Sequence, residues 1–474
     1  MTLRELTGGG APDVEISGLA YSTAQAGPGS LFFCVPGFRT DGHDFAPDAI
    51  ERGAVALVVE RPLDLGVPEV IVEDARAAMG PAAVRFYGDP TANLDVVGVT
   101  GTNGKTTTAF LVRHLLEADG RACGLLGTVK RVVAGREEEV ERTTPEAIDL
   151  QATFRAMLDG GDRACAMEVS SHALELGRVD GIHFACRVFT NLTQDHLDFH
   201  HTMEAYFAAK RRLFETPGAA VVNVDDEYGR RLAAELDSTT FAIDRDADYR
   251  ALDVEFDLMG SRFRCLTPDG ELHVSSPLPG LFNVQNVLAA VAAAHSLGVP
   301  GETIAAALPL FGRVPGRFEP VDEGQDFGVL VDYAHTPEAL ENVLRAARPL
   351  TEGRLHVVFG AGGDRDRGKR PLMGAIAARE ADVAIVTSDN PRSEDPDVII
   401  AEIVAGIDDR AGVEVDVDRR AAIRRAIELA EPGDVLVIAG KGHEQGQEFA
   451  GGRKEPFDDV AVARAALRAV RAGA

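Results

Sequence analysis

Short runs of apolar residues recur along the whole chain, and stretches with helical spacing separate them. The runs are rich in valine and alanine, and most of them end at glycine or at polar residues. Such runs are typical of strands buried on both faces, as in a mostly parallel sheet that helices cover. The pattern therefore predicts an α/β fold. We expect strands at Ser30–Val35, Ala54–Val59, Val70–Val72, Ala164–Val169, Val188–Leu192, Ala219–Val224, Val329–Asp332, Leu355–Phe359, Val383–Thr387 and Val435–Ala439.

Two segments that contain glycine and proline divide the chain into three sections. Gly88-Asp89-Pro90 closes the first group of strands, and Phe311–Gly316 closes the second. Glycine and proline interrupt regular elements, so such segments mark turns and boundaries. We expect three domains, each long enough to bury a core of its own: 1–88, 89–314 and 315–474. The Ala- and Arg-rich end of the chain, Val460–Ala474, is expected to be a surface helix.

Composition excludes several classes of function. The formal net charge is −27, whereas a groove that follows a nucleic-acid backbone needs a basic excess. Five scattered cysteines without a Cys-x-x-Cys pair are typical of free thiols in a reducing cytoplasm. No apolar signal-peptide core follows Met1, and His295 and Ser296 interrupt the apolar stretch Val287–Val299. We therefore expect a cytoplasmic protein without nucleic-acid partner or membrane insertion.

The segment Leu94–Thr108 is the most informative part of the chain. It reads as a buried strand, a glycine-rich loop and the start of a helix. Backbone N–H groups of such a loop approach phosphate oxygens closely, and the helix N-terminus adds partial positive charge. Lys105 can reach the β- and γ-phosphates, and the Thr106 hydroxyl can ligate Mg²⁺. Although Val99 stands where the common phosphate-loop pattern has its first glycine, the segment predicts a nucleoside-triphosphate site.

Polar loops follow two further strands of the middle section. Glu168-Val169-Ser170-Ser171-His172 could face the phosphates, and Asn191–His201 is dense in oxygen ligands and imidazoles. Zinc is an alternative occupant, but no thiolates accompany the histidines, and a neighbouring phosphate favours Mg²⁺. Next along the chain, Tyr206–Phe214 reads as a helix with basic residues, and its pattern alone predicts a solvated Lys210.

Three strand-end loops of the last section carry basic residues. They are Gly360–Pro371, Ser388–Pro396 and Gly440–Glu444. In open α/β sheets ligands bind at the carboxyl ends of the strands, so these loops are expected to share one site. Arginine bonds carboxylate and phosphate through two parallel N–H groups, and such loops in an acidic protein predict recognition of one of these anions.

With these residues in view, the chain resembles the Mur ligase family over its whole length, and within it the members that add 2,6-diaminopimelate. Six motifs in one order carry the resemblance: Gly101–Thr107, Glu168–His172, Asp195–Asp198, Leu278–Asn286, Asp332–Pro337 and Asp389–Arg392. The resemblance implies an N-terminal domain for a UDP substrate, a central ATPase and a C-terminal Rossmann-like domain for the incoming amino acid. It implies that ATP phosphorylates the carboxylate of UDP-N-acetylmuramoyl-L-alanyl-D-glutamate, and that the amine of diaminopimelate attacks the acyl phosphate. This step belongs to peptidoglycan precursor synthesis.

The resemblance also implies roles for single residues. Catalytic positions are Lys105, Glu168, His196 and Lys210, and the expected ligands of two Mg²⁺ ions are Thr106, Glu168, His196 and Lys210. Lys210 is implied to be carbamylated (N6-carboxylysine), which overturns the reading from its pattern. The ATP positions are Gly101, Thr102, Asn103, Gly104, Lys105, Thr106, Thr107, Asn283, Arg317, Asp332 and His335.

For the UDP substrate the matching positions are Ser22, Thr143, Thr144, Ser170 and Arg178. The family's Asp-Ser-Arg is Tyr21-Ser22-Thr23 here, which affects the expected uridine contacts. For diaminopimelate the positions are Arg365, Asp389, Asn390, Pro391, Arg392, Gly440 and Glu444. Arg392 is expected to bind the distal carboxylate that separates diaminopimelate from lysine, and Glu444 the distal amine.

Other functions stay open at this point. A lysine-adding Mur ligase is expected to lack Arg392, and a folylpolyglutamate synthetase to lack the Asp389–Arg392 motif. A GTP-binding switch protein would need an Asn-Lys-x-Asp motif, which the sequence does not contain. An inactive relative that serves only in interactions would not be expected to keep this set together: Lys105, Thr106, Glu168, His196 and Lys210. A monomer is expected.

Overall fold

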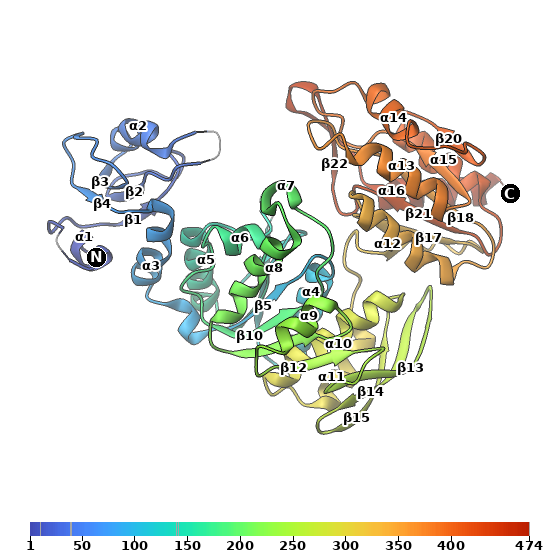
Figure 1. Cartoon of the computed structure of the whole chain (residues 1–474), viewed down its shortest axis with the longest axis horizontal. Helices are drawn as coiled ribbons and strands as arrows, with labels where there is room; N and C mark the ends of the chain where they lie inside the picture. The colour runs from blue at the N-terminus through green and yellow to red at the C-terminus, as the bar shows by residue number, and fades with distance from the viewer. Residues whose placement is uncertain (10, 38–39, 139, 141, 474) are drawn as a thin grey trace. The chain divides into compact units, whose positions relative to one another are not determined.

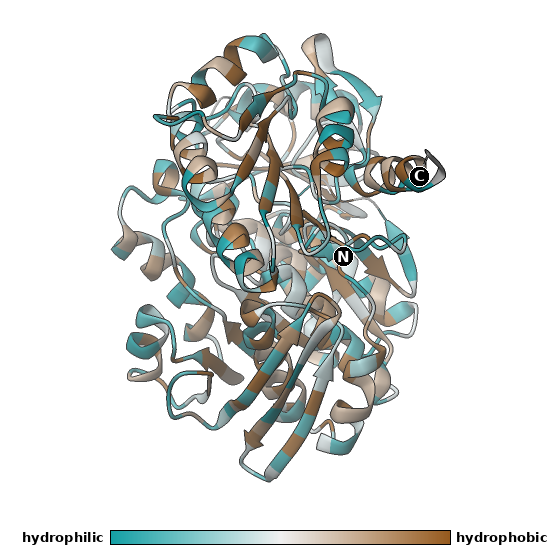
Figure 2. Cartoon of the chain, turned by 90° about the vertical axis from the view of Figure 1, so that its right-hand side faces the viewer, coloured by the Kyte–Doolittle hydropathy of each residue, from teal (hydrophilic) through white to brown (hydrophobic). Residues whose placement is uncertain are grey.

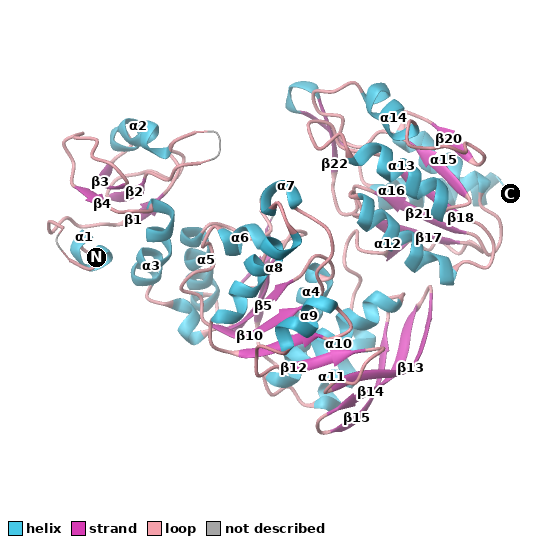
Figure 3. Cartoon of the chain, in the orientation of Figure 1, coloured by secondary structure: helices cyan, strands magenta, loops and turns pink. Residues whose placement is uncertain are grey.

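The computed structural model describes residues 1–9, 11–37, 40–138, 140 and 142–473, and all statements below refer to them. Figure 1 labels the helices and strands along the chain. The chain divides into two compact units. Unit 1 comprises 1–250 and 286–307, and unit 2 comprises 251–285 and 308–474. Both are α/β structures, in agreement with the class predicted from the sequence (Figure 3).

A four-stranded parallel sheet opens unit 1, in the order β1-β2-β3-β4. Its strands are β1 (Gly18–Ala20), β2 (Ser30–Phe33), β3 (Ala54–Val59) and β4 (Glu69–Ile71). Its helices are α1 (Leu3–Thr7), α2 (Ala46–Glu51) and α3 (Ala75–Tyr87). Asp74 caps the long helix α3 by accepting from the Ala77 amide, and Gly88 ends it in a left-handed conformation. The predicted boundary at residue 88 therefore coincides with a helix end.

The second sheet has eleven strands, in the order β15-β14-β13-β12-β11-β10-β5-β9-β6-β7-β8. Its middle is parallel, as the buried apolar runs predict. The strands are β5 (Asp95–Thr100), β6 (Cys123–Leu126), β7 (Arg131–Val133), β8 (Arg136–Glu138), β9 (Ala164–Glu168), β10 (Phe184–Phe189), β11 (Ala219–Asn223), β12 (Thr239–Ala242), β13 (Tyr249–Asp257), β14 (Gly260–Thr267) and β15 (Gly270–Ser276). The helices of this section are α4 (Lys105–Ala118), α5 (Ala147–Asp159), α6 (Ser171–Glu175), α7 (Leu197–His200), α8 (Met203–Arg211), α9 (Glu227–Ala233), α10 (Leu281–Ser296) and α11 (Gly301–Ala307).

The third sheet lies in unit 2, in the order β16-β17-β21-β18-β19-β20. Its strands are β16 (Glu319–Pro320), β17 (Gly328–Asp332), β18 (Leu355–Phe359), β19 (Val383–Val386), β20 (Val413–Val415) and β21 (Val435–Ala439). A two-stranded hairpin, β22 (Gly446–Phe449) with β23 (Arg453–Pro456), follows β21. The helices are α12 (Pro337–Ala347), α13 (Lys369–Glu380), α14 (Pro396–Val404), α15 (Arg419–Leu429) and α16 (Asp459–Gly473). Short 3₁₀ turns complete the chain: Gly42–Phe45, Pro90–Asn93, Arg212–Glu215, Leu308–Leu310, Arg348–Leu350 and Ala450–Gly452.

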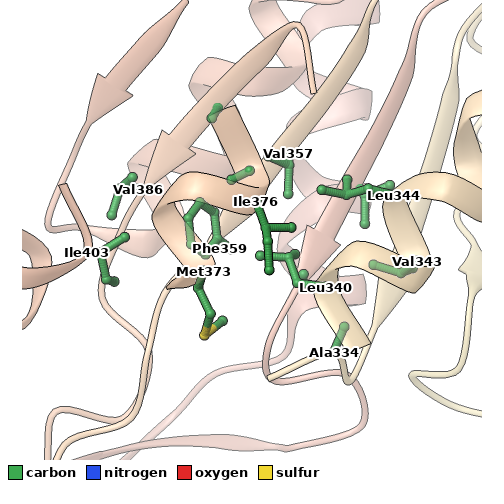
Figure 4. Packing of buried hydrophobic residues seen from close by; sticks show 14 of the residues in the cluster. Ala334, Leu340, Val343, Leu344, Val357, Phe359, Met373, Ile376, Val386 and Ile403 are labelled. Atoms are coloured by element: carbon green, nitrogen blue, oxygen red, sulfur yellow. The ribbon is translucent and has the colours of Figure 1, made fainter. Parts of the chain in front are cut away.

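Alternation along the strands of this third sheet builds two cores. Val357 and Phe359 pack with α12, α13 and α14 (Figure 4). Val358 between them packs with α15 and α16 on the other face. Successive side chains of a strand point to opposite faces, so every second residue serves the same core. Figure 2 shows the apolar residues concentrated on the strands. This double covering explains why the strands read as continuous apolar runs.

Most predicted strands agree with the structure within two residues. The prediction Val188–Leu192 is misplaced, because β10 spans Phe184–Phe189 and Asn191 already belongs to a loop. The expected surface helix at the end of the chain exists as α16, but Val462, Ala463 and Leu467 on one of its faces are buried; Ala474 lies outside the described residues. All five cysteines are buried and free. No helix among the described residues is long and apolar enough to span a membrane.

A helical glycine tests how tightly α13 packs on α14. A methyl group at Gly374 would lie 2.1 Å from the carbonyl oxygen of Ile403. This oxygen belongs to the backbone of α14, so it cannot move aside as the end of a flexible side chain can. Gly374→Ala should therefore destabilise unit 2 by about 1–3 kcal/mol, although alanine in an exposed helix is favoured by about 1 kcal/mol. The midpoint of urea unfolding, followed by circular dichroism, measures this. An unchanged or raised midpoint would contradict the packing.

Candidate active site

The phosphate-loop segment forms the predicted strand, loop and helix. β5 ends at Thr100, the loop runs to Gly104, and α4 begins at Lys105. Gly101 and Gly104 have φ values of 151° and 85°, which side chains disfavour. Methyl groups would lie 1.9 Å from Thr190 Oγ1 at Gly101 and 2.3 Å from Asn286 Oδ1 at Gly104. Both glycines are thus required by the chain around them.

The loop that follows β10 holds the phosphate loop in place. The Thr102 amide donates to the Asn191 carbonyl oxygen at 2.9 Å. The Thr190 hydroxyl donates to the Asn103 carbonyl oxygen at 2.6 Å. The Asn103 amide donates to Asn191 Oδ1 at 2.9 Å. These bonds fix the conformation of a loop whose backbone belongs to no helix or strand.

Two lysines meet at the phosphate loop. Lys105 Nζ donates to the carbonyl oxygens of Gly101 (3.0 Å) and Thr102 (2.8 Å). Lys210 Nζ donates to the same Gly101 oxygen at 2.7 Å and lies 4.7 Å from the centre of the Tyr206 ring. Lys210 is 1% exposed, so the solvated lysine predicted from its pattern is wrong. Burial, with a contribution from Lys105, holds the Lys210 pKa well below its ordinary value.

Glu168 occupies the end of β9, beside the strand that leads into the phosphate loop. It pairs in register with Val99 and is 1% exposed. Its carboxylate accepts from the Thr128 amide at 2.7 Å and from the Thr128 hydroxyl at 3.1 Å. A methyl group at Gly127 would lie 2.4 Å from Glu168 Oε1. Thr128 was not predicted as a site residue, because it lies in a loop without a motif.

Three histidines gather over α8. The rings of His172 and His196 are 4.8 Å apart, and those of His172 and His200 are 5.6 Å apart. His200 stacks on Tyr206 at 5.0 Å, and its Nε2 lies 2.9 Å from Ser171 Oγ. His196 has a left-handed backbone with a φ of 52°. All three histidines lie in the polar loops noted in the sequence, but only His196 was predicted as a site residue, from the resemblance to the family.

Burial keeps these imidazoles neutral. It lowers the pKa of His196 to about 4, and it also lowers those of His172 and His200. A neutral imidazole can donate an electron pair to a metal ion. In the part of the chain that the structure describes, no three His, Cys, Asp or Glu side chains are grouped as metal ligands. The Glu168 carboxylate and the buried Thr106 hydroxyl are oxygen donors of the kind that Mg²⁺ takes.

Four of the five residues expected at the UDP substrate are neighbours. The Ser170 amide donates to Thr144 Oγ1 at 3.1 Å, and the Arg178 guanidinium donates to the Thr144 carbonyl oxygen at 3.1 Å. Thr143 Oγ1 lies 3.0 Å from Thr128 Oγ1. The structure therefore connects these residues to Glu168 through Thr128.

A buried carboxylate collects arginines at the same place. Glu146 is 3% exposed and pairs with Arg178 (3.1 Å), Arg76 (2.9 Å) and Arg142 (3.0 Å). Arg76 belongs to α3 of the N-terminal section, so this carboxylate joins two predicted domains. Glu146 was not predicted as a site residue, because the arginines that pair with it come from different parts of the sequence.

Tyr21, which stands where the family has aspartate, makes a contact of its own. The Tyr21 hydroxyl donates to Asp149 Oδ2 at 2.5 Å, and Gln25 Nε2 donates to Asp149 Oδ1 at 3.0 Å. Burial raises the pKa of Tyr21. Ser22 contributes backbone carbonyl bonds to the Gln25 and Ala26 amides, and the structure does not bring it to the Thr144 network. Tyr21 thus serves as a contact between the N-terminal section and α5.

Four more expected nucleotide positions lie in unit 2. Asn283 is buried and donates to the Pro279 carbonyl oxygen at 2.8 Å. The Arg317 guanidinium lies 4.9 Å from the centre of the Tyr333 ring. Asp332 Oδ2 accepts from the Phe318 amide at 2.7 Å, and burial raises the pKa of this carboxyl while Arg317 opposes the rise. His335 Nδ1 lies 2.8 Å from the Tyr333 carbonyl oxygen, and burial lowers its pKa.

The loops after β18, β19 and β21 converge as predicted for strand ends. A methyl group at Gly440 would lie 2.6 Å from Asp389 Oδ2, and one at Gly362 would lie 3.0 Å from Arg392 Nη1. The same point at Gly362 is 3.9 Å from the Arg365 side chain. Asn390 Nδ2 donates to Glu444 Oε2 at 2.8 Å. The expected amino-acid positions therefore form one cluster within unit 2.

Arg392 is held by Glu448, which lies outside the Asp389–Arg392 motif. Its Nε donates to Glu448 Oε2 at 3.0 Å and its Nη1 to the Gly363 carbonyl oxygen at 2.8 Å. Its backbone is left-handed, with a φ of 53°, and its amide donates to the Glu448 carbonyl oxygen at 3.0 Å. An arginine kept in this conformation is strained, and such strain concentrates at functional sites.

Fold and site together define a class of multidomain α/β proteins with a lysine-bearing phosphate loop. Three family models match the chain: Mur ligase family, catalytic domain (residues 15–87), Mur ligase middle domain (99–294) and Mur ligase, glutamate ligase domain (316–442). The chain belongs to the Mur ligase family.

Curated relatives cover nearly the full chain. UDP-N-acetylmuramoyl-L-alanyl-D-glutamate–2,6-diaminopimelate ligase of Geobacillus thermodenitrificans is 50% identical over 473 residues, which is 97% of this chain and 96% of that protein. The protein of the same name from Streptomyces coelicolor is 48% identical over 486 residues, 98% of this chain and 96% of its own.

Solved structures show the same fold. One of a UDP-N-acetylmuramoyl-L-alanyl-D-glutamate–2,6-diaminopimelate ligase has a TM-score of 0.72 at 33% identity and covers 99% of each chain. Folylpolyglutamate synthase of Mycobacterium tuberculosis, at 18% identity and a TM-score of 0.62, covers 83% of this chain and 95% of its own and shares the fold alone.

Two glycines that flank α4 provide a matched test of the phosphate loop. Gly104 before the helix and Gly120 after it have φ values of 85° and 83°, but only Gly104 has a neighbour within 4 Å of the added methyl group. Alanine at either position should lower the free energy of unfolding by about 1–2 kcal/mol, because a residue with a Cβ atom is strained in a left-handed backbone. Only Gly104→Ala should also weaken ATP binding, by at least about tenfold, because it displaces Asn286 and the loop.

Titration calorimetry with ATP measures this difference in affinity. Equal ATP affinity of the two variants would contradict the role of the loop.

Proposed function

We propose that this chain is an ATP-dependent ligase that joins 2,6-diaminopimelate to UDP-N-acetylmuramoyl-L-alanyl-D-glutamate during peptidoglycan precursor synthesis. The observation that carries the proposal is the 50% identity to a ligase of that name over 97% of the chain. Two clusters support it: Lys105, Glu168, His196 and Lys210 lie in unit 1 with the phosphate loop, and the expected diaminopimelate positions lie together around Arg392 in unit 2.

The chemistry requires an activated carboxylate. A carboxylate is a poor electrophile, and γ-phosphoryl transfer from ATP converts it into an acyl phosphate with a good leaving group. The amine of the incoming amino acid then attacks the acyl carbon, and phosphate leaves as the amide forms. Catalysis of phosphoryl transfer depends on positioning and on charge neutralisation. Lys105 is the residue that we assign to the phosphates, and Thr144, Ser170 and Arg178 are assigned to the acceptor substrate.

Two Mg²⁺ ions are part of the proposal. The Thr106 hydroxyl, the Glu168 carboxylate, the His196 imidazole and modified Lys210 would hold them, and the metals would neutralise charge on the transferred phosphoryl group. The neutral state of His196 supports its assignment, since a protonated imidazole has no electron pair for a metal.

The environment of Lys210 supports its proposed carbamylation. The reaction needs a neutral amine, and burial beside Lys105 favours that form. The neutral amine forms an N–C bond with CO₂ and releases one proton, which leaves a carbamate anion where protonated lysine would carry a positive charge. The charge pair with Lys105 then becomes attractive instead of repulsive.

Selectivity for diaminopimelate is assigned to Arg392. Diaminopimelate carries a distal carboxylate that lysine lacks, and a guanidinium binds a carboxylate through two hydrogen bonds. Glu448 orients this guanidinium in the structure, so substrate carboxylate and Glu448 would share it. This favours diaminopimelate over the lysine-adding alternative. The folylpolyglutamate alternative has support only from the shared fold.

The remaining assignments extend the family pattern. The domains 1–88, 89–314 and 315–474 would bind the UDP end, ATP and the amino acid, respectively. The enzyme would act as a cytoplasmic monomer. The test of the whole proposal is ADP release from the full chain with ATP, Mg²⁺ and the UDP-muramoyl dipeptide, against a panel of amino acids. Release that depends on diaminopimelate is expected. A preference for lysine, or no release with any amino acid, would overturn it.

Removal of the Lys210 amine tests the carbamate. Lys210→Ala should lose nearly all ligase activity, and added acetate should restore part of it by supplying a carboxylate in the cavity left behind. Wild-type protein equilibrated with ¹³C-bicarbonate should show a carbamate signal by NMR that Lys210→Ala lacks. Full activity of Lys210→Ala would contradict the proposal, as would the absence of that signal from active wild-type protein.

Truncation of Arg392 tests selectivity. Arg392→Ala should raise the KM for diaminopimelate by orders of magnitude, because losing a desolvated charge pair costs about 2–5 kcal/mol. The KM values for ATP and the UDP substrate should change little. Lysine should remain a poor substrate, because removing a repulsive group does not create a pocket.

The unpaired Glu448 left by this truncation would also repel the substrate. The double variant Arg392→Ala/Glu448→Gln should therefore regain part of the loss. Exposed Arg453→Ala serves as the control. Unchanged diaminopimelate kinetics in Arg392→Ala would refute the assignment.

A further inference from the structure

One fully buried cation in unit 2 has no part in the chemistry described so far. Lys441 follows Gly440 directly after β21, and its side chain is 0% exposed. Its Nζ donates to Asn390 Oδ1 at 2.9 Å and to Glu444 Oε2 at 3.0 Å. Burying an ammonium group is costly unless it is paired and hydrogen-bonded. A lysine at this position therefore needs a reason beyond the filling of space.

Lys441 completes a triangle with the two residues that it contacts. Asn390 Nδ2 donates to the same Glu444 oxygen, Oε2, at 2.8 Å. Asn390 Oδ1 accepts a second bond from the Glu448 amide at 3.0 Å. The amide of Asn390 is thus oriented with its oxygen toward two donors and its nitrogen toward Glu444. Because Oε2 of Glu444 receives both internal bonds, its Oε1, on a side chain that is 32% exposed, is the oxygen left for a ligand.

The charge of Lys441 acts on a second carboxylate. Asp389 is buried, and its Oδ2 has no hydrogen-bond partner among the described residues. Burial opposes ionisation of this carboxyl, but Lys441 and Arg419 together hold its pKa below the ordinary value. Lys441 therefore acts on two carboxylates: it donates to partly exposed Glu444 and favours ionisation of buried Asp389.

We propose that Lys441 is a positioning residue for the amino-acid substrate. It orients Asn390 and Glu444 as one unit and keeps their charge balanced, so that Glu444 presents Oε1 to the substrate's ammonium group. Lys441 itself does not touch the substrate. The inference rests on the proposed function, which assigns Asn390 and Glu444 to the amino acid. It adds a determinant that lies behind the residues in contact with the ligand.

The test compares Lys441→Met, which keeps the length of the side chain but removes its charge and donors, with exposed Lys454→Met as the matched control. The full chain is assayed for ADP release at varied diaminopimelate, ATP and UDP substrate. Lys441→Met should raise the KM for diaminopimelate by at least about tenfold, with kcat at saturation and the other two KM values close to wild type. Lys454→Met should match wild type throughout.

A double-mutant cycle separates positioning from general destabilisation. If Lys441 acts through Glu444, Lys441→Met should add little to the KM effect in a Glu444→Gln background. A purely structural lysine would give additive effects and would change all three KM values. Lys441→Gln, which retains a donor without charge, is the second variant in case Lys441→Met does not fold, and it should show a smaller rise in the same KM.

The outcomes distinguish this inference from the proposed function. Wild-type activity with diaminopimelate, together with an unchanged diaminopimelate KM in Lys441→Met and Lys441→Gln, would overturn the positioning role and leave the ligase assignment intact. Additive effects in the cycle would overturn it as well. A wild-type chain without diaminopimelate-dependent activity would overturn both.

Discussion

The carbonyl oxygen of Gly101 is the atom at which the phosphate loop, α4 and α8 of unit 1 meet. It accepts hydrogen bonds from two lysine ammonium groups, Lys105 from α4 and Lys210 from α8. Two cations at one buried oxygen repel each other strongly in a medium of low dielectric. The structure relieves this repulsion by burial, which favours the neutral amine of Lys210. The same burial favours the form of Lys210 that the proposed reaction with CO₂ requires.

Glycine makes this arrangement possible. A side chain at Gly101 would collide with Thr190, so the loop after β10 could not lie against the phosphate loop. That second loop leads on to His196 and then to α8, which carries Lys210. One close backbone approach thus brings the nucleotide loop, the histidines and the buried lysine together. In unit 2, Gly440 and Gly362 give the same freedom to Asp389 and Arg392.

Much of this could be predicted from the sequence, and the failures have physical causes. Contiguous signals worked: the phosphate loop is one segment of strand, loop and helix, and the strands Ala54–Val59, Leu355–Phe359 and Val435–Ala439 agree with the structure to the residue. The pattern of Tyr206–Phe214 failed for Lys210, because spacing along a helix reveals a polar face but not what packs against it. Only the resemblance to a family pointed to its burial.

The sequence by itself determined the α/β class, the nucleotide loop and the residues that gather at the strand ends, because these depend on local spacing and on the period of strands and helices. Tertiary structure alone decided the partners. Four pairs join segments that lie far apart in the sequence: Thr128 with Glu168, Glu146 with Arg178, Glu448 with Arg392, and Lys441 with Asn390. These pairs form where loops meet at the edge of a sheet. No pattern along the chain specifies which loops lie close together in space.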